Sequence, residues 1–131
     1  MQLIINNKVY TDNSKEADEN SVFVVSKQNE KFKENAIANG CKEIIDSSEL
    51  KNHIDFSSIK IIGITGTNGK TTTAAAIYSI LLDLGYKVAL QGTRGFFIND
   101  ERVEDYSLTT PVQLGNFAHI QKAMQNDCDF F

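Results

Sequence analysis

The sequence predicts an α/β fold in two parts: a small α/β domain at residues 1–57, and at 58–131 the first part of a domain built on a parallel sheet. Three observations support this prediction. Short β-branched runs alternate with longer stretches that carry apolar residues at helical spacing. One such run, residues 59–64, is followed directly by a glycine-rich turn and a helical pattern. The residues before this run also differ in character from those after it, which places the boundary near residues 55–58.

The strands expected in the first part are short, apolar or β-branched runs bounded by polar residues. They are residues 3–5, 8–10, 21–25 and 43–45. Because Asn6-Asn7 separates the first two runs, these are expected to form a hairpin.

Two helices are expected in the first part. Residues 30–39 form the longer helix, and Gly40 follows it at a position typical of a C-terminal cap. The residues expected to face inward from this helix are Phe32, Ala36 and Ile37. Residues 46–48 could cap a second, short helix that extends through His53.

The second part is expected to run in the order strand, turn, helix, strand. Residues 59–64 form a buried parallel strand, residues 72–84 a helix ended by Gly85, and residues 86–90 the next strand. Apolar residues of the helix recur at helical spacing, which predicts its buried face. They are Ala76, Ile77, Ile80, Leu81 and Leu84.

The remainder of the second part is expected to continue the sheet. Residues 91–95 form a loop at the ligand-facing edge, and residues 96–98 pair with residues 102–103. Pro111 fits the first turn of a helix. The apolar residues on one face of that helix are Leu114, Phe117, Ile120 and Met124. Residues 129–131 begin another buried strand.

The turn after the first strand of the second part is Gly66-Thr67-Asn68-Gly69-Lys70, followed by Thr71. Its two glycines let backbone N–H groups approach a phosphate and allow positive φ angles. A helix that begins near Lys70 adds free N–H groups and the positive end of its dipole. Lys70 carries a positive charge to the β- and γ-phosphates, and the Thr71 hydroxyl is placed to bind Mg²⁺. This order of elements is the P-loop arrangement, which predicts a mononucleotide-binding domain.

One position departs from the general P-loop pattern. The pattern G-x-x-x-x-G-K-[ST] would place its first glycine where this chain has Ile64, and Gly63 lies one residue earlier. The alternative is an ordinary glycine turn between a strand and a helix. Gly-Lys-Thr at a strand-to-helix junction favours the P-loop.

The segment GITGTNGKTTT, residues 63–73, resembles the P-loop of the Mur ligases, the ATP-dependent amide-forming enzymes of bacterial peptidoglycan precursor synthesis. In that family the loop begins Gly-Thr-Asn/His-Gly-Lys, which accounts for the missing first glycine. The resemblance implies a catalytic role for Lys70 and Mg²⁺ binding by Thr71. The residues that it assigns to ATP binding are Gly66, Thr67, Asn68, Gly69, Lys70, Thr71 and Thr72.

Three further residues match family segments that contact the substrate. Ser14 matches a serine that contacts the UDP-muramoyl substrate, although its neighbours Asn13 and Lys15 depart from the family pattern. The alternative for Ser14 is a solvated loop serine. Thr109 and Thr110 match a Thr-Thr-Pro segment that binds the muramoyl peptide. The alternative for this pair is that one threonine simply caps the following helix.

Within the family, the chain resembles the members that add the third amino acid, meso-diaminopimelate or L-lysine, to UDP-N-acetylmuramoyl-L-alanyl-D-glutamate. The resemblance implies that residues 1–57 hold the UDP end of the substrate. It also implies that ATP phosphorylates a substrate carboxylate, and that the amine of the amino acid attacks the acyl phosphate to give an amide, ADP and phosphate. We therefore expect an N-terminal fragment of a ligase, inactive alone and monomeric at full length. The alternatives are another P-loop NTPase or kinase, and a non-catalytic nucleotide-binding fragment.

Composition argues against several other classes. The net charge of −4, with no obvious basic face, argues weakly against a nucleic-acid partner. No apolar run approaches the ~20 residues that span a membrane, and the N-terminus does not resemble a signal peptide. A cytoplasmic protein without membrane insertion is therefore expected.

The remaining reactive residues form no predicted site. Cys41 and Cys128 lack metal-binding spacing and are expected to be reduced, partly buried thiols. His53 and His119 are expected on helix surfaces. The acidic residues Glu101, Glu104 and Asp105 are expected to form a solvated charge run rather than a metal site.

Overall fold

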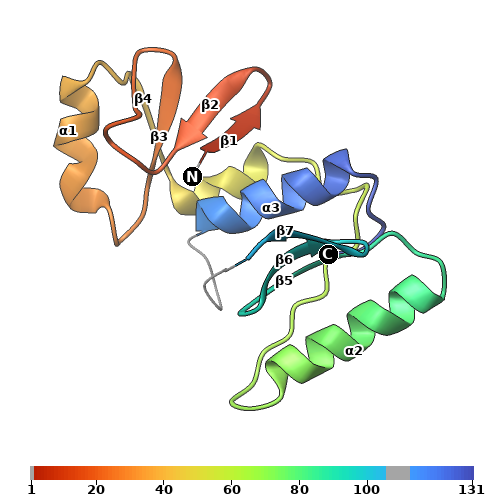
Figure 1. Ribbon diagram of the computed structural model, residues 1–131. Helices are drawn as coiled ribbons and strands as arrows, with labels where there is room; N and C mark the ends of the chain where they lie inside the picture. The colour runs from red at the N-terminus through yellow and green to blue at the C-terminus, as the bar shows by residue number, and fades with distance from the viewer. Residues whose placement is uncertain (1, 106–112) are drawn as a thin grey trace. The chain divides into compact units, whose positions relative to one another are not determined.

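The computed structural model describes residues 2–105 and 113–131, which form two compact units that combine helices and strands (Figure 1). The first unit runs to Asp55 and includes helix α3 (Gln113–Gln125) as far as Ala118. The second unit begins at Phe56 and includes His119–Phe131. The predicted α/β class is confirmed. No helix in the described ranges is long and apolar enough to cross a membrane.

A four-stranded sheet forms the centre of the first unit (Figure 1). In spatial order its strands are β1 (Gln2–Ile5), β2 (Lys8–Thr11), β3 (Ser21–Val25) and β4 (Glu43–Asp46). β1 and β2 form the predicted hairpin, and β3 pairs in parallel with both β2 and β4. Asn6 and Asn7 have φ angles of 50° and 63°, as a two-residue turn between twisted strands requires.

Alternation along β3 places apolar side chains on both faces of this sheet. Val22 and Val24 belong to one buried cluster, which also contains Leu3, Ile5, Tyr10, Leu50 and Leu114. Phe23 belongs to a second cluster with Ala17, Ala36 and Cys41. Both faces of the sheet are therefore covered by apolar residues, and helix α1 (Lys33–Ala38) contributes Ala36 to the second cluster.

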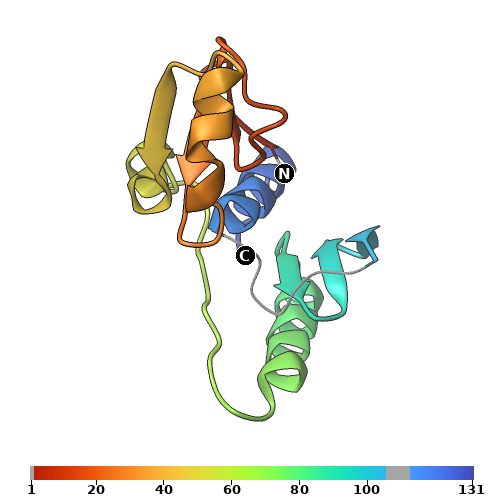
Figure 2. The same ribbon diagram turned by 90° about the vertical axis from the view of Figure 1, so that its left-hand side faces the viewer.

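The helices of the first unit are shorter than predicted. Residues 30–39 form a 3₁₀ turn, η1 (Glu30–Phe32), followed by the six residues of α1, which lies against the sheet in Figure 2. Of the predicted inward-facing residues, Ala36 is buried, whereas Phe32 and Ile37 are 41% and 52% exposed. Because Phe32 lies in a 3₁₀ turn, which is more tightly wound than an α-helix, it does not share the face of α1 on which Ala36 is buried. The predicted helix at residues 46–53 is a second 3₁₀ helix, η2 (Ser47–Asn52), and Asp46 caps it by accepting from the Ser48 N–H at 2.9 Å.

An antiparallel sheet of three strands lies in the second unit. Its strands are β5 (Ala89–Gly92), β6 (Gly95–Ile98) and β7 (Glu101–Glu104), in that spatial order. The predicted pairing of residues 96–98 with 102–103 is confirmed. The predicted loop at residues 91–95 is wrong: Gly92 pairs with Gly95, so only Thr93 and Arg94 remain for the turn. Gly95 permits this tight hairpin because its φ of 122° is accessible to glycine.

Three segments predicted as parallel core strands lie side by side but pair with one another only through isolated bridges, and the segment predicted at residues 86–90 becomes a strand only at Ala89, where β5 begins. Lys60 and Val88 each bridge Phe130 in parallel. The Lys60 N–H donates to the Asp129 carbonyl at 2.9 Å, and the Ala89 N–H donates to the Phe130 carbonyl at 2.9 Å. The chain around Phe130 therefore lies between the other two segments.

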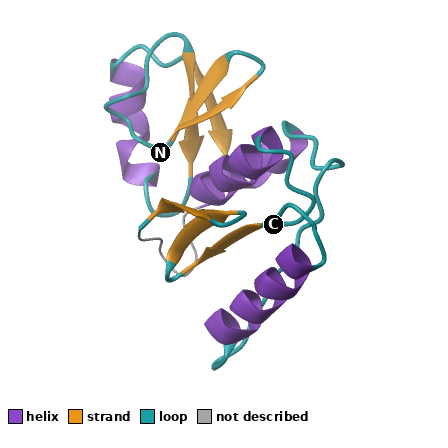
Figure 3. Ribbon diagram, turned by 45° about the vertical axis from the view of Figure 1, so that its right-hand side comes forward, coloured by secondary structure: helices purple, strands orange, loops and turns teal. Residues whose placement is uncertain are grey.

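The segment before the glycine turn is not the buried strand that was predicted. Figure 3 draws it as a loop leading into α2 (Lys70–Asp83). Ile61 and Ile62 are 50% and 42% exposed, whereas Ile59 is buried. The segment before the glycine turn forms hydrogen bonds with the chain around Phe130. It therefore does not reach the burial expected of a strand that has neighbours on both sides.

Helix α2 begins and ends close to the predicted residues but exposes part of its apolar face. Ile80 and Leu84 are 57% and 68% exposed, and Ala76 is also exposed, although all three were predicted to be buried. Within the described residues α2 packs on β5 along one side (Figure 1), so only that side of the helix is covered. Gly85, at φ 86°, ends the helix as predicted, with its N–H donating to the Leu82 carbonyl at 2.9 Å.

Candidate functional site

The glycine turn has the backbone geometry that a phosphate-binding loop needs. Gly66 and Gly69 have positive φ angles of 148° and 79°, which glycine adopts readily because it lacks a Cβ atom. The turn is solvent-exposed, and α2 begins directly after it at Lys70. Gly69 occupies the N-cap position, where no side chain caps the helix. The first-turn N–H groups and the positive helix end are therefore presented at the turn, an arrangement that fits a phosphate.

The Lys70 side chain folds back over this turn. Its Nζ donates a hydrogen bond to the carbonyl oxygen of Gly66, and the residue is half-buried. An ammonium group carries three donors, so one bond to the loop leaves capacity for contacts to an anion. Lys70 thus lies where its charge reinforces the helix N-terminus.

The Thr71 hydroxyl lies at the first turn of α2, next to the β5–β6 turn. Its Oγ1 is 3.2 Å from the Oγ1 of Thr93, and both residues are exposed. Two adjacent hydroxyl oxygens can contribute to cation coordination or bind phosphate oxygens. No group of three or more His, Cys, Asp or Glu side chains in residues 2–105 and 113–131 is placed to hold a metal ion.

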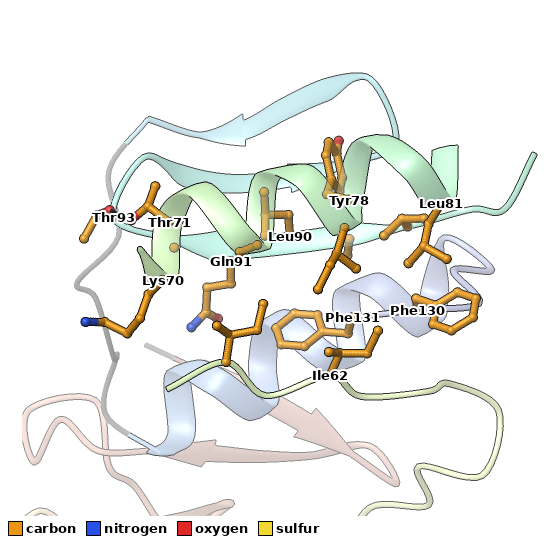
Figure 4. Close-up of a pocket in the computed structure, with 16 residues that line it drawn as sticks. Ile62, Lys70, Thr71, Tyr78, Leu81, Leu90, Gln91, Thr93, Phe130 and Phe131 are labelled. Atoms are coloured by element: carbon orange, nitrogen blue, oxygen red, sulfur yellow. Dashed lines mark hydrogen bonds between the residues drawn. The ribbon is translucent and has the colours of Figure 1, made fainter. Parts of the chain in front are cut away.

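A cavity of about 140 Å³ lies beneath α2 (Figure 4). Most of its lining is apolar and comes from α2, β5 and the segments around Ile62 and Phe130. Polar side chains also line it, contributed by the first turn of α2 and the end of β5. They are Lys70, Thr71, Gln91 and Thr93. The cavity therefore combines an apolar lining with groups that can contact an anion.

Gln91, which lines this cavity, and its neighbour His119 were not predicted as site residues. His119, expected on a helix surface, is 3% exposed, and its Nδ1 lies 2.6 Å from Gln91 Oε1. Its Nε2 lies 3.1 Å from Glu104 Oε2, so Glu104 is not merely part of a solvated charge run. One signal was present in the sequence: His119 is four residues before the apolar residue Ala123, so both fall on one helix face.

The residues predicted to contact the substrate are only partly described. Ser14 belongs to the first unit and is 8% exposed, so the alternative of a solvated serine is wrong. Its carbonyl oxygen accepts from Asn39 Nδ2 at 2.7 Å. A hydrogen bond from Asn13 lowers the pKa of the nearby Glu16 carboxyl. Thr109 and Thr110 lie outside the described residues.

Other reactive or charged residues are placed as follows. Cys41 and Cys128 are free, buried thiols, in agreement with the prediction. His53 is exposed, also as predicted, and its ring lies 5.8 Å from that of Tyr10. Arg94 is exposed at the β5–β6 turn, where its carbonyl oxygen accepts a hydrogen bond from Arg102.

These features define a class: an α/β protein whose second unit has a P-loop-type turn and helix. Comparison with known families identifies the class more closely. The Mur ligase middle domain matches residues 64–131. The chain therefore belongs to the Mur ligase family.

Individual relatives agree with this assignment. The chain is 49% identical over 121 residues to the UDP-N-acetylmuramoyl-L-alanyl-D-glutamate–2,6-diaminopimelate ligase of Wolinella succinogenes, covering 92% of this chain and 28% of the relative. It is 51% identical over 122 residues to the ligase of the same name from Helicobacter hepaticus, covering 89% of this chain and 26% of the relative. The chain thus spans little more than a quarter of the length of these relatives.

A solved structure supports the fold independently. A UDP-N-acetylmuramoyl-L-alanyl-D-glutamate–2,6-diaminopimelate ligase superposes with a TM-score of 0.70 at 22% identity, covering 92% of this chain and 30% of that structure. At this level of identity the similarity establishes the fold.

Proposed function

We propose that this chain supplies the ATP phosphate-binding turn of a ligase that adds 2,6-diaminopimelate to UDP-N-acetylmuramoyl-L-alanyl-D-glutamate. The observation that carries the proposal is the uncapped N-terminus of α2, which follows a glycine turn and places Lys70 over that turn. The two relatives described above are named for this reaction, and together they support the choice of amino acid. L-Lysine is the alternative amino acid.

Different groups of the turn and of α2 make different contacts to a bound triphosphate. Backbone N–H groups around Gly66 and Gly69 surround the phosphate, because glycines keep side chains out of its way. The first turn of α2 adds its dipole and N–H groups. Lys70 stabilises negative charge as the γ-phosphoryl group transfers. Thr67, Asn68 and Thr72 complete the set proposed to bind ATP.

A divalent cation also fits this site. The exposed Thr71 hydroxyl is an oxygen ligand of the kind that Mg²⁺ accepts, with phosphate oxygens and water as the usual remaining ligands. When bound, Mg²⁺ would neutralise charge on the β- and γ-oxygens. Thr71 supplies a protein oxygen for it at the first turn of α2, beside Thr93.

The assignment of the two units follows from the same proposal. Residues 1–57 would form the domain that binds the UDP end of the substrate, with Ser14 as a contact, and residues 58–131 the first part of the ATP-binding central domain. Thr109 and Thr110 would bind the muramoyl peptide. The protein is proposed to act in the cytoplasm as a monomer, without a nucleic-acid partner. The chain of 131 residues alone is not expected to complete the reaction.

Replacement of Lys70 tests the proposal. Lys70→Ala in the complete gene product should reduce ligation at least about a hundredfold, the scale seen when one preorganised electrostatic group is removed. The assay measures released phosphate and the tripeptide product with ATP, Mg²⁺, UDP-muramoyl-dipeptide and diaminopimelate.

A second lysine provides the matched control. Lys87 lies on the surface, in an ion pair with Asp127 at 3.6 Å. Because exposed ion pairs contribute little, Lys87→Ala should leave ligation unchanged. Turnover of Lys70→Ala within about tenfold of wild type would contradict a P-loop role, since the lost electrostatic group should cost more. Amide formation with lysine but not with diaminopimelate would contradict the proposed substrate.

A further inference from the structure

The Glu16 carboxylate accepts three side-chain hydrogen bonds within the first unit. Its Oε1 accepts from Asn13 Nδ2 at 2.9 Å. Its Oε2 accepts from Gln2 Nε2 at 3.1 Å and from the Thr11 hydroxyl at 3.3 Å. Because Gln2 belongs to β1 and Thr11 to β2, these bonds tie the segment that follows β2 to two strands of the sheet.

Ser14 lies within the tight turn that this segment forms. The Glu16 N–H donates to the Asn13 carbonyl oxygen at 3.0 Å, and the Lys15 N–H donates to Asn13 Oδ1 at 3.1 Å, so both bonds span Ser14. The Ser14 carbonyl oxygen accepts from Asn39, the residue after α1, at 2.7 Å. Because Ser14 is only 8% exposed, the orientation of this turn decides how much of the residue a ligand can reach.

The Asn13 side chain connects Glu16 to the turn, and the roles of its two ends are set by their partners. The Lys15 N–H can only donate, so it meets the amide oxygen, and an ionised carboxylate can only accept, so Glu16 meets the amide nitrogen. The hydrogen bond from Asn13 lowers the pKa of the Glu16 carboxyl and so favours its ionised form. Asparagine serves both bonds, whereas an aspartate at this position could accept from Lys15 but could not donate to Glu16.

We propose that Glu16 is a positioning residue for the UDP end of the substrate: through Asn13 it holds the turn in which Ser14 contacts the substrate. The inference rests on the proposed function, which assigns that contact to Ser14, and adds Asn13 and Glu16 to it. Glu16 acts through Asn13 and makes no contact of its own with the substrate. A turn that is ordered before the substrate arrives loses less conformational freedom on binding, which favours affinity.

Calorimetric titration of the complete gene product with UDP-muramoyl-dipeptide tests the inference. Asn13→Asp should weaken binding about tenfold, because it replaces a hydrogen bond with two facing carboxylates. Glu16→Gln should cost less than about threefold, because the amide oxygen can still accept from Asn13. The double variant Asn13→Asp/Glu16→Gln should return to within about threefold of wild type, because the introduced amide can donate to the introduced carboxylate.

A kinetic measurement separates positioning from folding. Asn13→Asp should raise KM for UDP-muramoyl-dipeptide and leave KM for ATP unchanged, whereas a merely structural defect would reduce the amount of active enzyme and therefore the apparent kcat. Glu19→Gln is the matched control. Glu19 is exposed between β2 and β3, as Glu16 is, but lies outside this hydrogen-bond network, so its variant should bind as wild type does.

The remaining outcomes separate this inference from the function on which it rests. Additive losses in the double variant would overturn the inference, since independent effects add. Asn13→Asp within about twofold of wild type would also overturn it, as would unchanged binding by Ser14→Ala, and both leave the ATP site tested by Lys70→Ala standing. Failure of the wild-type protein to bind UDP-muramoyl-dipeptide would instead remove the proposed function. Should Asn13→Asp not fold, Glu16→Ala decides: it should raise the same KM, and an unchanged KM overturns the inference.

Discussion

The hydroxyl oxygens of Thr71 and Thr93 lie 3.2 Å apart, which links the first turn of α2 to the turn between β5 and β6. The two residues are 22 positions apart in sequence and both are exposed. A hydroxyl can both donate and accept, so one of the pair can donate to the other while each oxygen still accepts or coordinates. The contact therefore brings a hydrophilic hairpin turn to the edge of the proposed phosphate site.

Thr71→Val should weaken Mg·ATP binding about tenfold, because it replaces a proposed Mg²⁺ ligand with a methyl group of similar volume. Thr71→Ser should keep most of the affinity, since the hydroxyl remains. Thr93→Val should have a smaller effect, because Thr93 would act by orienting Thr71. Titrations with and without Mg²⁺ measure these differences, and a loss for Thr71→Val that is equal in both would contradict metal binding by this hydroxyl.

Gly95→Ala should destabilise the second unit by about 2–4 kcal/mol, because it combines backbone strain with a steric clash. A Cβ at Gly95 would lie 2.2 Å from the carbonyl oxygen of Glu104, and the φ angle there is 122°. Gly92→Ala is the matched control in the same hairpin, since a Cβ at Gly92 meets nothing within 4 Å. Urea unfolding of both variants measures the difference, and equal stabilities would show that the hairpin can relax around residue 95.

The sequence predicted the local elements of the first unit well because their signals are local. Asn6-Asn7 specifies a tight turn wherever it occurs between strands, and the alternation along β3 places Phe23 opposite Val22 and Val24. The failures there concern Phe32 and Ile37, which are exposed. Phe32 lies in the 3₁₀ turn before α1, and a change from 3₁₀ to α geometry leaves no clear mark in the hydrophobic pattern.

The candidate site was predictable only where one continuous segment forms it. Gly66, Gly69 and Lys70 are consecutive parts of one turn, so their order alone indicated a helix N-terminus that fits phosphate. Gln91 and His119 are 28 residues apart, and Glu104 lies between them in sequence. Their contact depends on tertiary packing of the His119 side chain against the β5–β7 sheet, which periodicity does not specify.

Thr110→Val should weaken binding of UDP-muramoyl-dipeptide while the melting temperature changes little. The threonine is proposed to bind the muramoyl peptide, and the sequence predicts that it lies at a helix start, where a hydroxyl beside free N–H groups can hold a carboxylate or phosphate. Calorimetric titration and thermal unfolding of the complete gene product measure both quantities. Unchanged affinity together with a lower melting temperature would favour the alternative that the residue only caps the helix.

Cys128 should react slowly with iodoacetamide in the folded protein, because burial raises the pKa of its thiol and the thiolate is the reactive form. The same shift has a consequence for stability. A thiol whose pKa is raised on folding makes its full contribution to stability at pH values below the pKa of the unfolded state. That contribution is lost as pH rises through the higher pKa of the folded state. The stability advantage of wild type over Cys128→Ala should therefore narrow above pH 9.0, the ordinary pKa of the group.

Peptide-level mass spectrometry after timed alkylation separates Cys128 from Cys41, which is also free and buried. A short peptide that carries the sequence around Cys128 gives the rate for an exposed thiol. Denaturant unfolding of wild type and Cys128→Ala from pH 7 to pH 10 measures the stability difference. Alkylation at the peptide's rate under conditions where the protein stays folded would show that the thiol is reached without unfolding. A stability difference that is constant across this pH range would show that its ionisation is not coupled to folding.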